Sequence, residues 1–516
     1  MALVDEILNA NAATLCAAFL ALILITVYFR KAVVEFRIRR AGGARAPVIA
    51  GNIVTATRLY FGIAQSHFQN QFAENCTRIL DSLPRQKNGN LQHFGEFSLT
   101  NKKRVLITRD PEQIKTVLAT KFADFGHGAM WHRLWRPFLG DGIFATDGQQ
   151  WHDSRAMIRP MFVKDRLRNL DIFDSCTSKL LSKLPPSGVT LDVKDYFYRW
   201  TLDTTTDFLL GDNVNSLDFP DHEVAEAMSV AQRKQMLIFV LNPFAPIIPK
   251  KDYLLSIDKI EAFINPIIAR AVALQDQELE ELSKSDQDFT FLHSIARYSK
   301  DPKVIRDQIL SVLLAGRDTT AATMSWAIYE MSAYPQTWSR LRKEVLDALG
   351  TTGRPTYEIL KDMTYLKSVI NETLRLHPAV PINMREVLQD TSVPGNPGEP
   401  DIVLLKGDSV TIHTIGMHTR HDLYPPTSPT FLDPSVFSPE RWEVWTPKPW
   451  TYTPFHGGPR ICVGQNFALT EIAFCLVRFA QQFHRLEYRG DWAAQTLQAD
   501  IIGTPGQGVP VAFFED

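Results

Sequence analysis

Residues 455–464 read Phe455-His456-Gly457-Gly458-Pro459-Arg460-Ile461-Cys462-Val463-Gly464, and the residues that follow, 465–483, have the apolar periodicity of a helix. Cys462 therefore lies where a glycine-rich loop meets a helix N-terminus. Unpaired N–H groups and the positive end of the helix dipole favour a thiolate at such a position. A thiolate held there is a soft metal ligand.

The other cysteines do not complete a metal cluster with Cys462. They stand far apart, at Cys16, Cys76, Cys176 and Cys475, and no C-x-x-C pair occurs. This excludes a disulfide scaffold and a clustered zinc site. A single cysteine can still be the axial ligand of haem, because the porphyrin supplies four more ligands. Several nearby residues suit that cofactor: Gly458 and Gly464 would let the backbone approach the macrocycle, Phe455 would cover the sulfur, and Arg460 would pair with a propionate.

The pattern F-x-x-G-x-R-x-C-x-G resembles the haem loop of the cytochrome P-450 superfamily, the haem-thiolate monooxygenases. The resemblance extends over the whole chain after residue 45. It implies a mainly α fold with a small β region and a single large haem-binding domain. The stretches GDGIFATDGQQWHDSRAMIRPMF, LHPAVPINMR and PFHGGPRICVGQNFALTE are most similar to fungal microsomal hydroxylases of alkanes and fatty acids.

A second family motif precedes the haem loop. Glu372-Thr373-Leu374-Arg375 resembles the family's E-x-x-R, on a helix expected over 364–376, and its i, i+3 spacing places both charges on one helix face. The usual third partner is an arginine, here Arg441 of Pro439-Glu440-Arg441-Trp442, where Trp replaces the family's Phe. The resemblance implies a buried, structural network that fixes the cysteine loop. Two strands are expected between the two motifs, over 401–405 and 409–415.

A third motif interrupts a long apolar helix expected over 301–334. Ala315-Gly316-Arg317-Asp318-Thr319-Thr320 resembles the family's oxygen-activation sequence A-G-x-D-T-T. The resemblance assigns the hydroxyl role to Thr319 and proton relay to Asp318, beside a local helix distortion that admits water. The alternative is a threonine bonded back to the i−4 carbonyl and an aspartate on the helix surface.

Further residues are assigned to the cofactor and the substrate by resemblance. Trp151 and Arg155 match the family's W-x-x-x-R, whose side chains reach a haem propionate, and Arg385 stands where the family often places another propionate-binding residue. The substrate-facing candidates lie before the oxygen motif, after the E-x-x-R helix and in the 120–145 region. They include Leu313, Leu314, Ala315, Val380 and Ile382, for which ordinary core packing is the alternative.

The N-terminal segment predicts a membrane anchor. Residues 12–29 carry no charge, acidic residues precede them, and five basic residues follow at positions 30–40. The stretch is long enough to span a thin bilayer, and its flanking charges place the rest of the chain in the cytosol. We expect a single-pass anchor of the endoplasmic reticulum with its basic linker in residues 1–45, and the catalytic domain in 46–516. A cleaved signal peptide would carry its positive charge before the apolar run.

Charge and missing motifs limit the partners. The formal net charge is −2, which gives no basic field for nucleic acid. The sequence contains no nicotinamide- or flavin-binding motif, so NADPH electrons must come from a separate protein. By resemblance, this is NADPH–cytochrome P-450 reductase, with cytochrome b5 as an optional second donor.

The sequence therefore predicts a haem b monooxygenase that inserts one oxygen atom of O2 into a C–H bond of a lipophilic substrate. A fatty acid or alkane and a polyketide or terpenoid both remain open as that substrate. Two alternatives remain: a haem-dependent isomerase or dehydratase, which often lacks the acid and threonine, and a non-catalytic haem- or lipid-binding protein.

Overall fold

The computed structural model describes residues 12–86, 88–99, 103–162, 170–284 and 289–515. Its helices make up 59% of the chain, which confirms the predicted mainly α class. The chain forms two compact units. The sheet unit combines the described residues of 1–63 with 76–126 and 384–412, and the helical unit combines 64–75, 127–383 and the described residues of 413–516. No linker marks these units because the chain passes between them repeatedly.

The sheet unit is built on a five-stranded sheet of order β1-β2-β8-β5-β3. The β2–β8 pair is parallel, whereas β1–β2 and β3–β5 are antiparallel. A separate antiparallel pair joins β6 to β7. The strand bounds are β1 Phe94–Phe97, β2 Val105–Thr108, β3 Phe125–Gly126, β5 Ile382–Val387, β6 Thr391–Val393, β7 Ile402–Leu404 and β8 Ser409–His413.

The second predicted strand ends earlier than its sequence pattern suggests. We expected it to reach residue 415, but β8 stops at His413, and the short helix α18 (Thr414–His418) begins directly after it. An apolar residue such as Ile415 is compatible with a strand or with a helix, and tertiary packing selects the helix here.

The predicted anchor is one helix that is longer than its apolar run. α2 extends over Ala12–Arg40, so the segment after Phe29, expected to be a basic linker, is helical. Within it, Thr14–Arg40 is long and apolar enough to cross a membrane, and none of its most apolar window is buried in the protein. Near its C-terminal end, Val34 and Ile38 pack on Val403 of β7 and on Leu405, the residue after this strand.

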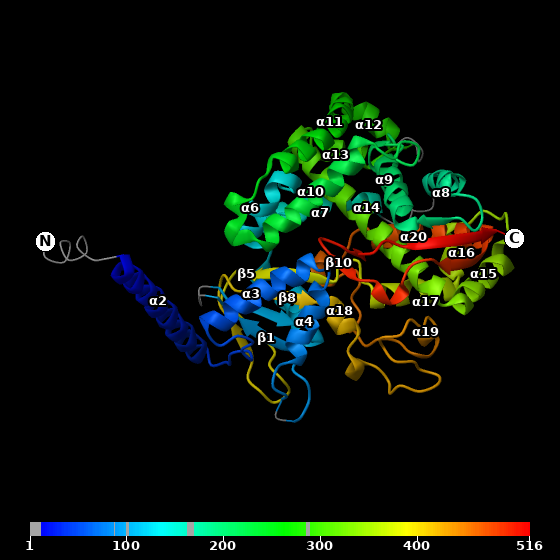
Figure 1. The fold of residues 1–516 in the computed structure, drawn as a ribbon. Coiled ribbons are helices and arrows are strands. Elements are labelled where there is room, and N and C mark those ends of the chain that lie inside the picture. Colours follow the sequence, from blue (N-terminus) through cyan, green and yellow to red (C-terminus); the bar gives the residue numbers. More distant parts are fainter. Residues whose placement is uncertain (1–11, 87, 100–102, 163–169, 285–288, 516) are drawn as a thin grey trace. The chain divides into compact units, whose positions relative to one another are not determined.

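Helices dominate the rest of the chain (Figure 1). The bounds of the other helices are α3 Ile53–Phe68, α4 Phe72–Asp81, α5 Pro111–Lys115, α6 Gly128–Leu139, α7 Gly148–Ile158, α8 Asp171–Lys183, α9 Val193–Leu210, α10 Glu223–Val240, α11 Lys251–Ala273, α12 Asp276–Leu282, α13 Phe291–Tyr298, α14 Pro302–Ala333, α15 Pro335–Leu349, α16 Tyr357–Asp362, α17 Thr364–Leu376, α19 Arg441–Val444 and α20 Gln465–Gln482. Strands β4 (Thr190–Asp192), β12 (Pro510–Glu515) and β9 (Phe483–Tyr488) pair in that order, and β10 (Leu497–Ala499) pairs with β11 (Gly503–Pro505).

Helix α14 crosses the helical unit, with α9 packed along it (Figure 1). It starts as its sequence predicts, because the Asp301 side chain accepts from the Lys303 N–H and Pro302 occupies the first turn. Met324 of α14, Trp200 of α9 and Phe474 of α20 belong to one buried apolar cluster. The helix that carries the oxygen motif is thus fixed on a rigid core against α20, the helix that follows Cys462.

One ionisable group lies inside this core. Glu471 of α20 is fully buried, and burial raises the pKa of its carboxyl from 4.5 to about 8, although the Thr320 hydroxyl of α14 lowers it. Between these two pKa values the folded protein holds a proton that the unfolded chain has lost. The contribution of Glu471 to the free energy of unfolding therefore falls as the pH rises from about 4.5 to about 8.

We predict that Glu471→Gln removes this pH dependence. The Tm of the variant minus that of the wild type should rise between about pH 5 and about pH 8, because glutamine cannot ionise. Thermal unfolding followed by circular dichroism checks this, with the exposed Glu280→Gln on α12 as the control. An equal difference at both pH values would show that Glu471 does not titrate in this range.

Candidate functional site

A single buried carboxylate organises the region before the haem loop. Arg375 donates to both oxygens of Glu372 through Nε and Nη2, each at 2.8 Å, and Arg441 Nε donates to Oε1 at 2.9 Å. All three side chains are inaccessible to water. The predicted network of Glu372, Arg375 and Arg441 is therefore present in the structure. Two guanidinium groups outweigh the desolvation of one carboxylate, so the pKa of Glu372 is lowered despite its burial.

The network has two further donors that sequence analysis did not identify. The Ser438 N–H donates to Glu372 Oε1 at 2.9 Å, and Trp442 Nε1 donates to Oε2 at 3.0 Å. The tryptophan that replaces the family's phenylalanine thus adds a hydrogen bond to a buried charge. The indole N–H is the signal that could have identified it, since a buried indole N–H generally has an acceptor.

The network extends to the haem loop through a buried histidine. His418 Nδ1 lies 3.2 Å from the Arg375 carbonyl, and His418 Nε2 accepts from the Thr453 N–H at 2.9 Å. Burial and the nearby Arg375 lower the pKa of His418 to about 3, so the ring is neutral and can hold both bonds. The Tyr452 hydroxyl adds a bond of 3.1 Å to the Asn371 carbonyl on α17. The start of the loop is therefore tied to α17.

The loop itself is tightly turned around Cys462. The Cys462 N–H donates to the Phe455 carbonyl at 3.0 Å, which closes the turn. His456 and Gly458 both have left-handed φ, at 68° and 67°. A histidine held in that region is strained, so the surrounding contacts must impose it. Gly458 is needed because its φ is one that other residues adopt only with strain.

Cys462 is accessible to solvent but closely surrounded by protein. Its side chain keeps surface accessible to water, yet the protein around it raises the pKa of the thiol by desolvation. The Gly464 N–H and Arg155 act in the opposite direction, as expected for a helix N-terminus, but burial outweighs them. A sulfur that is both accessible and enclosed suits a metal ligand, because a bound cation would stabilise the thiolate against this desolvation.

Two guanidinium groups lie close to the Trp151 ring, near Cys462. The Arg460 guanidinium carbon lies 4.5 Å from the ring centroid and that of Arg155 lies 6.0 Å from it. Arg155 Nη1 also donates to the carbonyl of Ile461, the residue before the cysteine, at 2.9 Å. Trp151, Arg155, Arg460 and Cys462 are therefore brought together as predicted.

This donor set fits haem. An enclosed cysteine sulfur suits the iron. Asp147 compensates the charge of Arg460, and the neighbouring Arg155 adds a second positive charge, so positive charge is left for an anionic propionate. Among the described residues, no group of three or more histidine, cysteine or carboxylate side chains could hold a metal ion by itself. A cofactor that brings its own ligands agrees with this chemistry.

The oxygen motif lies on an unbroken helix. The expected local distortion is absent, because α14 is α-helical throughout. The Thr319 hydroxyl donates to the Ala315 carbonyl at 2.7 Å. This is the bond to the i−4 carbonyl that the alternative interpretation describes for this threonine. Its oxygen can still accept a hydrogen bond.

Asp318 does not lie on the solvent-exposed face of α14, as the alternative interpretation would require. Its side chain is buried, and Arg317 Nη1 donates to its Oδ1 at 3.2 Å. Desolvation raises the pKa of this carboxyl, while Arg317 and Gln232 lower it. A buried carboxyl with a raised pKa is suited to carrying a proton.

The substrate-facing candidates separate into two groups. Leu313 has no accessible surface and Leu314 is almost fully buried, so both side chains are packed in the protein core in this structure. Ala315, Val380 and Ile382 keep partial exposure. Val380 packs against a small apolar cluster that includes Ala322, a residue about one turn after Thr319.

Arg385 belongs to the sheet unit, on β5, where its Nη1 donates to the Met384 carbonyl at 2.7 Å. Its role at a propionate stays a prediction.

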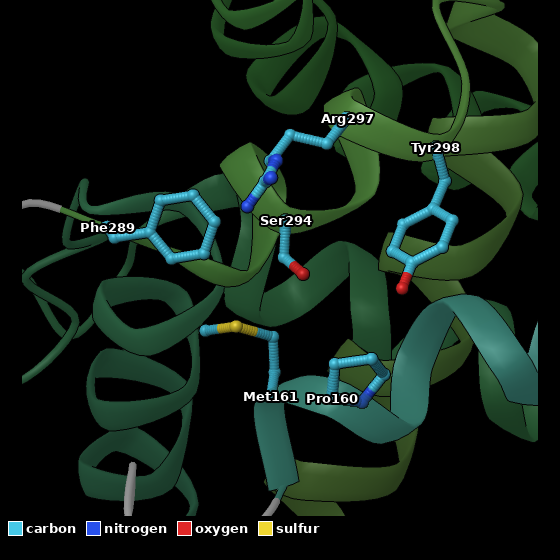
Figure 2. Close-up of a pocket in the computed structure, with 6 residues that line it drawn as sticks. All are labelled: Pro160, Met161, Phe289, Ser294, Arg297 and Tyr298. Carbon is cyan, nitrogen blue, oxygen red and sulfur yellow. The ribbon is translucent and has the colours of Figure 1, made fainter. Parts of the chain in front are cut away.

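A cavity of about 400 Å³ lies between the 3-10 turn after α7 and α13 (Figure 2). In Figure 2 the Ser294 hydroxyl and the Met161 thioether point into it. None of its lining residues is a predicted site residue: they are Pro160, Met161, Phe289, Ser294, Arg297 and Tyr298.

We predict that Trp442→Phe lowers the free energy of unfolding by about 2 kcal/mol, because one hydrogen bond to the buried Glu372 charge is lost. Denaturant unfolding measures this. Trp445→Phe is the matched control, since it makes the same change three residues away. Equal destabilisation by the two variants would show that the indole N–H of Trp442 contributes nothing specific.

Comparisons with known proteins agree with this geometry. The family model described as "Cytochrome P450" matches residues 78–499. The cytochrome P450 monooxygenase pvhE of Talaromyces variabilis is 45% identical over 434 residues, which cover 80% of each chain. Cytochrome P450 52A3-B of Candida maltosa is 35% identical over 449 residues, which cover 81% of this chain and 83% of the relative.

Among solved structures, the cytochrome P450DA heme domain has a TM-score of 0.69 at 20% identity, and the match covers 86% of this chain and 92% of that one. This confirms the predicted fold. The chain belongs to the cytochrome P450 family, and it is an oxygen-incorporating oxidoreductase that uses a haem-thiolate cofactor, O2 and NADPH-derived electrons from a reductase.

Proposed function

We propose that Cys462 is the axial ligand of haem b and that the enzyme inserts one oxygen atom of O2 into a C–H bond of a lipophilic substrate. The enclosed but accessible sulfur of Cys462 carries this proposal. It lies in a loop fixed through His418 to the buried Glu372 network. This rigidity matters, because a ligand atom must be held in place before the cofactor arrives.

Bound haem would supply the binding and activation of O2. The residues around it have separate tasks. Arg155 and Arg460 hold propionates by charge-assisted hydrogen bonds, and Trp151 supports both guanidinium groups from one side. Phe455, Gly458 and Gly464 shape the backbone on the sulfur side, and Arg385 is proposed as a further propionate partner.

Asp318 and Thr319 are the residues proposed to deliver protons. Asp318 would pass a proton through the protein interior, and the Thr319 hydroxyl would orient the oxygen that accepts it. The pair favours oxygen activation over a haem-dependent isomerase or dehydratase, which has no need of proton delivery to oxygen.

We propose two substrate classes: a fatty acid or alkane, or a polyketide or terpenoid secondary metabolite. The partly exposed candidate residues Ala315, Val380 and Ile382 are all apolar, which suits a lipophilic molecule of either class.

The location and the electron donor are also proposed. The exposed apolar helix α2 is compatible with membrane anchoring. Acidic residues before the apolar run at 12–29 and basic residues after that run support a single-pass anchor, residues 1–45, in the endoplasmic reticulum, with residues 46–516 as the cytosolic catalytic domain. NADPH–cytochrome P-450 reductase, with cytochrome b5 as an optional second donor, would then share the same membrane.

The full-length enzyme with reductase, NADPH, isotopically labelled O2 and a long-chain fatty acid tests the reaction. We expect an oxygenated product with one labelled atom, detected by mass spectrometry. Absence of any oxygenated product would remove the fatty acid as substrate and direct the same assay to polyketides and terpenoids.

We predict that Thr319→Ala lowers the product formed per NADPH by about tenfold while NADPH consumption continues, because proton delivery is impaired. Thr323→Ala is the matched control, since its hydroxyl donates to the i−4 carbonyl in the same way, at 2.8 Å. Unchanged product per NADPH in Thr319→Ala would contradict the proton-delivery role and favour a peroxide-using or isomerase reaction.

A further inference from the structure

The carboxylate of Asp147 lies at the junction of two helices and the cysteine loop. Asp147 occupies the position before α7, where an aspartate usually caps its own helix, but its side chain makes no such bond. Its Oδ1 accepts from the His127 N–H at 2.9 Å, and its Oδ2 accepts from the Gly128 N–H at 2.8 Å. Asp147 therefore caps the start of α6.

The same carboxylate binds the haem loop. Asp147 Oδ1 accepts from Arg460 Nη2 at 2.7 Å, and the same nitrogen donates to the Thr146 carbonyl at 3.0 Å. Only 8% of the Arg460 side chain is exposed, against 25% for Asp147. Burial lowers the pKa of Arg460 to about 10 and Asp147 opposes this, so the carboxylate compensates the charge of a largely desolvated guanidinium.

The other end of the connection between α6 and α7 is fixed independently. The Asp141 N–H donates to Asp307 Oδ2 at 2.8 Å, and Lys303 Nζ bridges both carboxylates at 2.6 and 2.8 Å. A Cβ on Gly140 would lie 2.1 Å from the Asp307 carboxylate, so the chain passes very close to α14 here. Loss of Asp147 would therefore release only the first turn of α6.

We propose that Asp147 is a positioning residue that couples the order of α6 to the charge of Arg460 beside the haem. This inference rests on the proposed function, in which Arg460 holds a propionate. One carboxylate serves a helix N-terminus, where the dipole attracts an anion, and a guanidinium of the cofactor site. Helix α6 lies within the 120–145 region proposed to face substrate, so Asp147 links that region to the cofactor.

The test compares Asp147→Asn with Asp153→Asn in the purified holoenzyme. Both remove one negative charge from the same segment, but the Asp153 side chain is 59% exposed, so its charge is screened by solvent. We expect Asp147→Asn to move the haem reduction potential to a more positive value, because the Arg460 charge beside the cofactor is then no longer compensated. The shift in Asp153→Asn should be much smaller. In an Arg460→Gln background, the shift in reduction potential caused by Asp147→Asn should be no larger than the shift caused by Asp153→Asn.

Hydrogen exchange supplies the second readout. The amides of residues 127–131 should exchange about tenfold faster in Asp147→Asn, as for loss of a helix cap, while those of 138–142 stay unchanged. A potential shift equal to that of Asp153→Asn, or unchanged exchange at 127–131, would overturn the proposal. Failure of the proposed function would look different from failure of this proposal. In the first case the wild type would lack a thiolate-haem spectrum, while the exchange comparison, which needs no cofactor, could still be made.

Discussion

The ion pair of Glu372 with two guanidinium groups is the interaction on which the site depends. A carboxylate without accessible surface costs several kcal/mol to desolvate, and a partner removed from such a group leaves an unpaired buried charge. Here five donors satisfy the two oxygens: three guanidinium N–H groups, one backbone N–H and the Trp442 indole. This geometry permits few alternatives, so it fixes α17 against the segment that leads to the cysteine loop.

The effect reaches Cys462 through rigid steps. The Arg375 carbonyl orients His418, His418 holds the Thr453 N–H, and the turn that starts there closes on the Cys462 N–H. The remaining side of the site is set by apolar packing, since α20, which begins after the loop, shares a core with α14. The sulfur and the oxygen motif are therefore positioned by one network and one core.

The sequence was sufficient to predict the structure wherever the deciding residues lie close together along the chain. The helices expected over 301–334 and 364–376 are present as α14 and α17, with bounds within one residue of those expected. It was insufficient where partners are distant along the chain. Asp147 resembles a cap of its own helix, yet its carboxylate binds α6 and Arg460, and His418 gave no signal of its bond to Thr453. Leu313 shows the same limit, because an apolar residue in a helix can face either core or substrate.

Ligation of haem by Cys462 can be tested most directly by the visible spectrum of the dithionite-reduced, carbon-monoxide-bound protein. Wild type and Cys475→Ala, which alters a buried core cysteine on α20, should both show the strongly red-shifted Soret band of thiolate-ligated haem. Cys462→Ala should lose it. A red-shifted band that persists in Cys462→Ala, or is absent from haem-loaded wild type, would contradict ligation by this loop.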